Sequence, residues 1–159
     1  MKFCRLLSAL LSIVAISAAQ DRGFTLEQVM SSPFPTELTS AAHANRIAWV
    51  FDSKGERNVW VADAPKFEAR QITHYQGDDG QDILALALTP DGKTAVYARG
   101  SELNSTGNVA NPASETKEPK QQVWAVDVET GKMQLLGALG CEQEGCEDIQ
   151  ISPDGKSVL

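Results

Sequence analysis

Three residues near the end of the sequence are of types that could do chemistry. Gly155-Lys156-Ser157 matches part of the Gly-x-Ser-x-Gly elbow that holds a nucleophilic serine, but Leu159 stands where the second glycine belongs. The same residues are similar to the end of a phosphate-binding loop, in which Gln150 replaces the first glycine. Both motifs are incomplete. We therefore interpret these residues as a turn and assign no catalytic residue in this chain.

Acidic side chains gather in two places where a metal ion could be imagined. One is Asp78-Asp79-Gly80, and the other holds Glu142, Glu144, Glu147 and Asp148. Neither segment has the alternating oxygen spacing of a calcium-binding loop. We interpret both as solvated charge on turns.

Two cysteines, Cys141 and Cys146, lie close together in the sequence. A zinc site needs two further Cys or His ligands, but His43 and His74 lie far upstream with no ligand spacing. In an exported protein, neighbouring cysteines pair more often than they bind metal. We expect a disulfide that closes a small loop, with unpaired thiols as the alternative, and we expect no metal or cofactor.

The first residues of the sequence predict export. Lys2 and Arg5 form a basic segment, residues 6–16 are mostly apolar, and Ser17-Ala18-Ala19 offers small residues for cleavage before Gln20. This is the layout of a secretory signal peptide, and the apolar run is shorter than the roughly 20 residues of a transmembrane helix. We expect a periplasmic or secreted protein that has no membrane segment after cleavage.

The charge of the chain argues against polyanionic partners. The sequence has 159 residues and a net charge of −7. Cleavage after Ala19 would remove Lys2 and Arg5 but no acidic residue, so the mature chain would be more acidic still. Such a surface repels phosphate backbones and anionic lipid headgroups. We therefore expect no nucleic-acid partner.

The elements change in character along the chain. Residues 24–30 predict a short helix, in which Thr25 is the N-cap, Gln28 completes a capping box and Phe24 packs on Val29. The prolines that follow end this helix. After residue 42 the sequence reads as short strands bounded by turn residues, and no helical period is sustained. The predicted strands cover residues 47–51, 58–62, 83–88, 94–98, 122–126 and 149–151.

Two motifs recur at nearly the same spacing. Thr89-Pro90-Asp91-Gly92-Lys93 returns as Ser152-Pro153-Asp154-Gly155-Lys156, and the Val-Trp strand around Trp60 returns around Trp124 at an offset that differs by one position. Repeated units of four antiparallel strands are typical of propeller blades. We expect both tryptophans to pack between stacked blades. The excess over a common blade lies in residues 100–120, which we interpret as a long loop.

The predicted fold is all-β, a partial β-propeller of about two four-stranded blades and the start of a third. It follows a signal peptide over residues 1–19 and a leader with a short helix over residues 20–42. The propeller region covers residues 43–159, with blade one at about 43–80, blade two at about 81–147, and the start of blade three at 148–159. Because a propeller closes with four or more blades, we expect the sequence to be a fragment of a longer product.

Several segments resemble one family of enzymes. The leader at residues 24–35, Arg46-Ile47-Ala48-Trp49-Val50 and residues 57–62 are similar to the amino-terminal part of bacterial exported peptidases of the prolyl oligopeptidase family, which includes dipeptidyl and acylaminoacyl peptidases. Arg70-Gln71-Ile72-Thr73 and Asp78-Asp79-Gly80-Gln81 continue the likeness. The resemblance covers essentially all of the chain from residue 24 onward.

The resemblance implies a role for the chain and locates the chemistry elsewhere. Members of this family place a propeller over an α/β-hydrolase domain with a Ser-Asp-His triad, so that short peptides are cleaved and folded proteins are excluded. No residue of the triad can be carried over to this sequence. Some dipeptidyl peptidases bind the amino terminus of the substrate with propeller glutamates, but no motif assigns that role to Glu102, Glu115 or Glu118 in the long loop.

Three functions therefore stand beside one another. The first is a non-catalytic, substrate-gating propeller fragment of an exported serine peptidase, whose peptide substrate binds through the missing hydrolase domain. The second is a periplasmic propeller like that of the Tol system, which binds partner proteins and has no chemistry. The third is a propeller enzyme that acts on sugars at its central channel. The oligomeric state and the substrate preference do not follow from the sequence.

Overall fold

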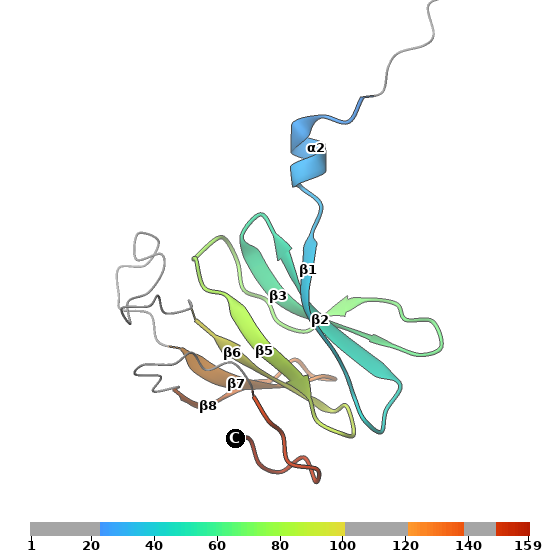
Figure 1. The fold of residues 1–159 in the computed structure, drawn as a ribbon, viewed down its shortest axis with the longest axis vertical. Coiled ribbons are helices and arrows are strands. Elements are labelled where there is room, and N and C mark those ends of the chain that lie inside the picture. Colours follow the sequence, from blue (N-terminus) through green and yellow to red (C-terminus); the bar gives the residue numbers. More distant parts are fainter. Residues whose placement is uncertain (1–22, 101–120, 139–148) are drawn as a thin grey trace, which may run out of the picture. The chain divides into compact units, whose positions relative to one another are not determined.

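The structure is a computed structural model that describes residues 23–100, 121–138 and 149–159 (Figure 1). The chain divides into two compact units, Met1–Ser32 and Pro33–Leu159. In the described part of the first unit, helix α2 spans Leu26–Met30. No helix in these described ranges is both long enough and apolar enough to span a membrane.

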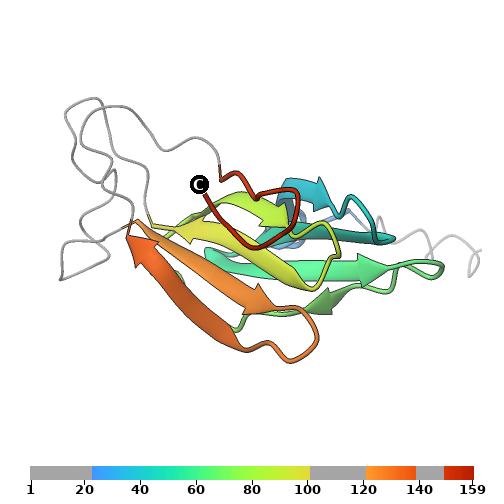
Figure 2. The ribbon, with the colours of Figure 1, turned by 90° about the horizontal axis from the view of Figure 1, so that it is seen from below.

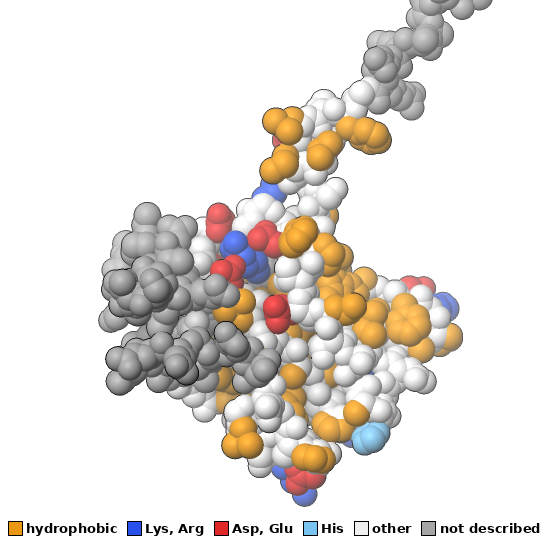
Figure 3. Space-filling view, in the orientation of Figure 1, with side chains coloured by type: hydrophobic (Ala, Val, Ile, Leu, Met, Phe, Trp, Pro, Cys, Tyr) orange, Lys and Arg blue, Asp and Glu red, His pale blue; other side chains and the backbone are white. Residues whose placement is uncertain are grey.

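Helix α2 is fixed by its cap. The Thr25 side chain accepts a hydrogen bond from the Gln28 amide at 3.1 Å, and the Gln28 side chain accepts one from the Thr25 amide at 3.0 Å. This confirms the predicted capping box. The predicted packing of Phe24 on Val29 buries neither residue, because they are 85% and 59% exposed. Figure 3 shows orange apolar side chains on the surface of the segment that holds this helix.

The second unit holds two four-stranded antiparallel sheets, which confirms the all-β, blade-like fold. Each sheet is formed by four strands in chain order. The first sheet consists of β1 (Phe34–Ser40), β2 (Arg46–Ser53), β3 (Glu56–Asp63) and β4 (Arg70–Gln71). The second consists of β5 (Ile83–Leu88), β6 (Thr94–Arg99), β7 (Gln122–Asp127) and β8 (Met133–Ala138), and its last hairpin is drawn in orange in Figure 2. We call these sheets the first and the second blade.

Strand β1 lies inside the segment that the sequence predicted as leader, residues 20–42. The first blade therefore begins at Phe34 and not near residue 43. Pro35 is accommodated because β1 is the edge strand of its sheet, where β2 is its one partner among the described strands. A bulge between Thr36 and Thr39, with Glu37 at a φ of 56°, interrupts the alternation that would have revealed the strand.

The two sequence motifs recur at nearly the same spacing, but each motif relates a different pair of units in the structure. The hairpin closed by Ala41 N and Arg46 O corresponds to the one closed by Thr89 N and Thr94 O. The offset from Ala41 to Thr89 is shorter than the offset from Trp60 to Trp124, because the long insertion lies between β6 and β7. The Val-Trp motif thus relates the first blade to the second, and the Pro-Asp-Gly motif relates the second to a third hairpin. That third hairpin is closed by Ser152 N and Ser157 O at 2.9 Å.

The core lies between the two blades. It is a single cluster of mostly aliphatic side chains that both sheets contribute. The first blade supplies Ala48, Val50, Val59, Val61 and Ile72, and the second supplies Ile83, Leu86, Leu88, Ala95, Tyr97, Val126 and Val128. Burial of these side chains is the main force that holds one sheet on the other.

The two repeated tryptophans do not share one environment. Trp124 packs against the core between the blades, as predicted. Trp60 lies between Val59 and Val61 in β3, and both valines belong to the core, so strand alternation directs Trp60 to the opposite face of the first blade. Its ring contacts Phe51 edge-to-face, with centroids 5.6 Å apart. Trp60 therefore does not lie between the two described blades, and its packing between blades stays a prediction.

Candidate functional site at the interface between the blades

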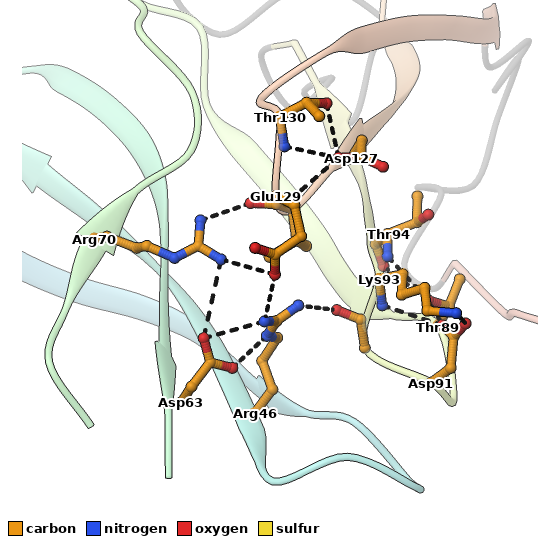
Figure 4. A network of polar contacts seen from close by, with 12 residues as sticks. Arg46, Asp63, Arg70, Thr89, Asp91, Lys93, Thr94, Asp127, Glu129 and Thr130 are labelled. Atoms are coloured by element: carbon orange, nitrogen blue, oxygen red, sulfur yellow. Dashed lines mark hydrogen bonds and ion pairs between the residues drawn. The ribbon is translucent and has the colours of Figure 1, made fainter. Parts of the chain in front are cut away.

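A network of charges joins the two blades at one end of the core (Figure 4). Arg46 begins β2 directly opposite Asp63, the last residue of β3, and its Nε lies 2.5 Å from Asp63 Oδ1. The same guanidinium donates to Glu129 Oε1 and to the Gly92 carbonyl, both at 2.7 Å. Glu129 and Gly92 belong to turns of the second blade. Arg46 therefore binds three groups on two sheets.

Arg70 in β4 reinforces this network. Its Nη1 donates to the Val128 carbonyl at 2.6 Å, and its Nη2 lies 3.4 Å from Glu129 Oε1 and 3.9 Å from Asp63 Oδ2. Two arginines thus share two carboxylates across the interface, as Figure 4 shows. The planar guanidinium suits this task, because its five donors can engage several acceptors at once.

The network shifts the pKa values of Arg46 and Asp63. The hydrogen bond from Arg46 holds the pKa of Asp63 below its ordinary value, against the opposing effect of burial. The hydrogen bond to Asp63 in turn raises the pKa of Arg46. The Arg46 side chain is only 14% exposed, whereas those of Asp63 and Glu129 are 42% and 66% exposed. Arg46 is therefore the buried centre of the network and depends on its acceptors.

The Pro90-Asp91-Gly92 turn, to which Arg46 donates, is held by side-chain hydrogen bonds. In the Pro90-Asp91-Gly92 turn, Asp91 Oδ1 accepts hydrogen bonds from Thr89 Oγ1 at 2.8 Å and from Lys93 N at 3.1 Å. Gly92 has a φ of +71°, the left-handed conformation that glycine adopts without strain. The aspartate side chain thus caps the turn. This cap fixes the carbonyl to which Arg46 donates.

Acidic residues at the opposite end of the blades also form ion pairs. Arg57 Nε lies 2.8 Å from Asp82 Oδ1 and 3.2 Å from Asp52 Oδ2, and its Nη1 lies 3.5 Å from Asp78 Oδ1. Asp79 binds Arg99 in β6. Burial opposes ionisation of Asp79, but hydrogen bonds from Arg99 and the Gln81 amide lower its pKa overall.

These ion pairs account for the carboxylates of Asp78-Asp79-Gly80, which were considered as metal ligands. The two carboxylates turn to different arginines and do not converge on one point. Within the residues that the structure describes, no group of three or more His, Cys, Asp or Glu side chains could hold a metal ion. The segment therefore contributes to cohesion between the blades.

Two tyrosines meet beside these pairs. The Tyr75 and Tyr97 hydroxyls are 2.8 Å apart, and the Arg99 guanidinium lies 3.9 Å from the centre of the Tyr75 ring. Burial raises the pKa of both phenols, so both stay protonated at neutral pH. Arg99 Nε is buried without an acceptor among the described residues. The contacts between these groups join the strand that contains Tyr97 to the segment after β4.

The other residues singled out by the sequence fall into two groups. Gly155-Lys156-Ser157 forms part of the third hairpin, where Ser157 N donates to Ser152 Oγ at 2.9 Å, as expected for a turn. His43 donates its amide to the Pro90 carbonyl at 2.8 Å, and the His74 ring lies 3.5 Å from Gln71. The remaining predictions concern residues outside the described ranges. These are the signal peptide, Glu102, Glu115, Glu118, the cysteines Cys141 and Cys146, and the acidic cluster of Glu142, Glu144, Glu147 and Asp148.

Sequence reasoning missed the acidic residue through which both arginines reach the second blade. Glu129 follows the Val-Trp strand in an ordinary turn, and no motif marks it. Arg46 and Arg70 did appear, but only as parts of segments that carry the family resemblance. The structure explains why arginine stands at both positions, since each spans the gap to the next blade.

Comparisons with known proteins extend the fold assignment. No protein-family model and no curated protein matches the sequence. Two solved structures match the chain at a TM-score of 0.53 and 12% identity, and each match covers 81% of this chain and 17% of the other. One is an acylaminoacyl peptidase from Pyrococcus horikoshii. The other comes from a structural and mechanistic analysis of two prolyl endopeptidases.

This likeness is one of fold. The two stacked sheets match the blade-like region of these peptidases, and the chain spans about a sixth of their length. The low identity transfers no residue roles.

Proposed function

We propose that this chain forms part of the propeller of an exported serine peptidase of the prolyl oligopeptidase family. The observation that carries the proposal is the stack of two four-stranded blades, which matches peptidase structures over 81% of the chain. We assign no catalytic group among the described residues. The nucleophile and its base belong to an α/β-hydrolase domain outside them, and the peptide substrate binds there.

The proposed role of the blades is to restrict access to that domain. A ring of stacked sheets admits a peptide only if the peptide is short or unfolded, provided that neighbouring blades do not separate. The described interface has the properties that this role requires. Its apolar core is flanked by charge networks at both ends, around Arg46 at one end and Arg57 at the other. Separation of the blades would expose the core and would remove the acceptors Glu129 and Gly92 from Arg46 and the acceptor Asp82 from Arg57.

Covalent labelling tests the catalytic part of the proposal. The protein expressed from its own gene is treated with a fluorophosphonate, which reacts with an activated serine. We expect one labelled serine, located by peptide mass spectrometry outside residues 23–159, and no labelling of protein that is heat-denatured before the reagent is added. A native protein that takes up no label contradicts the peptidase proposal and favours a propeller that only binds partner proteins.

Export is a separate part of the proposal. It is supported by the basic and apolar segments of residues 1–19. Mass spectrometry of the mature protein, isolated from cell fractions, tests it. We expect an amino terminus at Gln20 and recovery from the periplasm or the medium. A cytoplasmic protein that retains Met1-Lys2 contradicts it.

A further inference from the structure

The sheets of the two blades end in strands whose outer edges are protected to different degrees. An exposed strand edge presents free N–H and C=O groups to any other strand, and proteins block it with proline, bulges, charges or very short strands. In the first blade, β1 contains Pro35 and a bulge, and β4 consists only of Arg70 and Gln71. In the second blade, β5 contains a bulge between Leu84 and Ala87. These three edges therefore carry the usual protection.

Strand β8, the outer edge of the second blade, lacks most of this protection. Its sequence, Met133-Gln134-Leu135-Leu136-Gly137-Ala138, contains no charged residue and no proline. Among the described strands it pairs with β7 alone (Figure 2). Leu135 and Leu136 are 46% and 43% exposed. The one irregularity is a register shift at which Leu136 has no partner in β7, and the stretch from Met133 to Leu135 before it is regular.

The hydrogen bonds between β7 and β8 determine which backbone groups face outward. The Asp127 amide donates to the Lys132 carbonyl at 2.9 Å, so the backbone of Lys132 faces β7. Antiparallel strands alternate between residues that bond to their neighbour and residues that face away from it. Gln134 therefore bonds to β7, whereas Met133 and Leu135 direct their N–H and C=O groups away from it. These four groups form the outer edge of the regular stretch.

We propose that β8 pairs antiparallel with β8 of a second copy of this chain, so that the two second blades form one continuous sheet. A two-fold axis at Gln134 places Met133 opposite Leu135 of the second copy, and Leu135 opposite its Met133. The four outward groups of each strand then bond to those of the other. Each apolar side chain also gains an apolar neighbour across the strands. This inference does not depend on the peptidase activity in the proposed function.

The charges of the chain favour a second copy over a partner protein of opposite charge. The net charge is −7, so two copies repel each other over most of their surface. Strand β8 has no charge, and the two-fold axis at Gln134 places Lys132 opposite Leu136 of the second copy, so no like charges meet. An uncharged strand offers nothing to a strongly basic or acidic partner, but it always matches its own antiparallel copy.

A disulfide across the two-fold axis tests this pairing. In the protein expressed from its own gene, Cys4, Cys141 and Cys146 are replaced by serine and Gln134→Cys is introduced. Position 134 faces its own copy in a non-hydrogen-bonded pair, where Cα atoms lie about 4.5 Å apart, a separation that a disulfide can bridge. We expect mild oxidation to convert most of this variant to a covalent dimer. The control Lys66→Cys, whose lysine side chain is 76% exposed, should stay free of this cross-link. Equal cross-linking of the two variants overturns the proposal.

Charge substitutions test the same contact without a covalent bond and guard against misfolding. Gln134→Lys and Gln134→Glu each place two like charges opposite each other across the axis. We expect each variant alone to have a dimer dissociation constant at least about threefold above that of the unmodified protein, measured by analytical ultracentrifugation. A mixture of the two variants should recover the dimer, because lysine then faces glutamate. A mixture that stays as monomeric as its components overturns the proposal, and so do variants that dimerise like the unmodified protein.

The remaining outcomes assign the edge to another occupant or the dimer to another surface. An unmodified protein that is monomeric at all concentrations overturns the proposal. If the Met133 and Leu135 amides of that monomer resist hydrogen exchange, another strand of the same polypeptide covers β8. A dimer that neither cross-links at position 134 nor responds to charge there uses a different surface, and it also overturns the proposal. Dimerisation with both responses supports the proposal whether or not the protein takes up fluorophosphonate.

Discussion

Arg46 links the two blades through a single, largely buried guanidinium. In place of water, this guanidinium binds the carboxylates of Asp63 and Glu129 and the Gly92 carbonyl. An ion pair at an exposed site contributes little to stability. Here the cation is largely buried, and each of its acceptors is held by a strand or a capped turn. The network is therefore expected to matter for stability as well as for geometry.

Truncation of Arg46 measures that contribution. We expect Arg46→Ala to lower the free energy of unfolding by about 1–3 kcal/mol, because it removes charge-assisted hydrogen bonds and the buried stem of the side chain. Urea denaturation of the purified protein, followed by tryptophan fluorescence, gives the value. The matched control is Lys66→Ala, which removes an exposed pair with Glu68 at 3.7 Å and should change stability by less than about 0.5 kcal/mol. Equal effects of the two substitutions would contradict the assigned role.

Asp63 makes the same interface sensitive to acid. Its pKa is lower in the folded protein than in the unfolded chain, so its contribution to stability is present above the unfolded value of about 4 and is lost as the pH falls through the folded value. We expect the free energy of unfolding to fall more steeply between pH 5 and pH 3 in the native protein than in Asp63→Asn. Denaturation curves at a series of pH values provide the comparison. Parallel pH dependences would show that Asp63 is not responsible.

The turn between β2 and β3 has room only for the hydrogen atom that is the side chain of Gly55. Lys54 and Gly55 both have positive φ, at 57° and 87°, as the turns favoured in tight hairpins require. A Cβ on Gly55 would lie 2.3 Å from Asp78 Cγ, whereas a Cβ on Gly77, with a φ of +74°, would meet nothing within 4 Å. The two glycines thus share a backbone conformation and differ in the space around them.

Alanine at each position separates strain from collision. We expect Gly77→Ala to destabilise the protein by about 1 kcal/mol through backbone strain alone. Gly55→Ala should destabilise it by at least about 1 kcal/mol more, because Asp78 must move away from Arg57 to make room. Thermal or urea unfolding of both variants gives the difference. If Gly77→Ala proved the more harmful of the two, the packing around Gly55 would have been misjudged.

The elements differ in how far the sequence predicted them. Strands β2, β3 and β5 to β7 follow from apolar alternation and turn residues, and the cap of α2 follows from Thr25 and Gln28. Strand β1 does not, since Pro35 and the bulge at Glu37 hide its period. The side-chain partners across the interface could not be predicted from the sequence either. That Glu129 receives two arginines depends on how the sheets stack, and no local signal encodes it.

The blades together form a repeating structure in which each sheet offers one aromatic and one aliphatic face. The aromatic face of the second blade packs on the aliphatic face of the first, and the charge networks flank this contact. Such an interface resists separation, because opening it would expose the core and break the ion pair and hydrogen bond that Arg46 makes with the second blade. That resistance is the property on which a gating role depends.

Substrate size tests that role most directly. The protein expressed from its own gene is assayed with a panel of short peptides, and a cleaved sequence is then inserted into a surface loop of a small, stably folded protein. We predict that the free peptide is hydrolysed and that the same sequence in the folded carrier is not, until the carrier is unfolded and cut into peptides. Hydrolysis of peptide and folded carrier at equal rates would contradict a gating propeller.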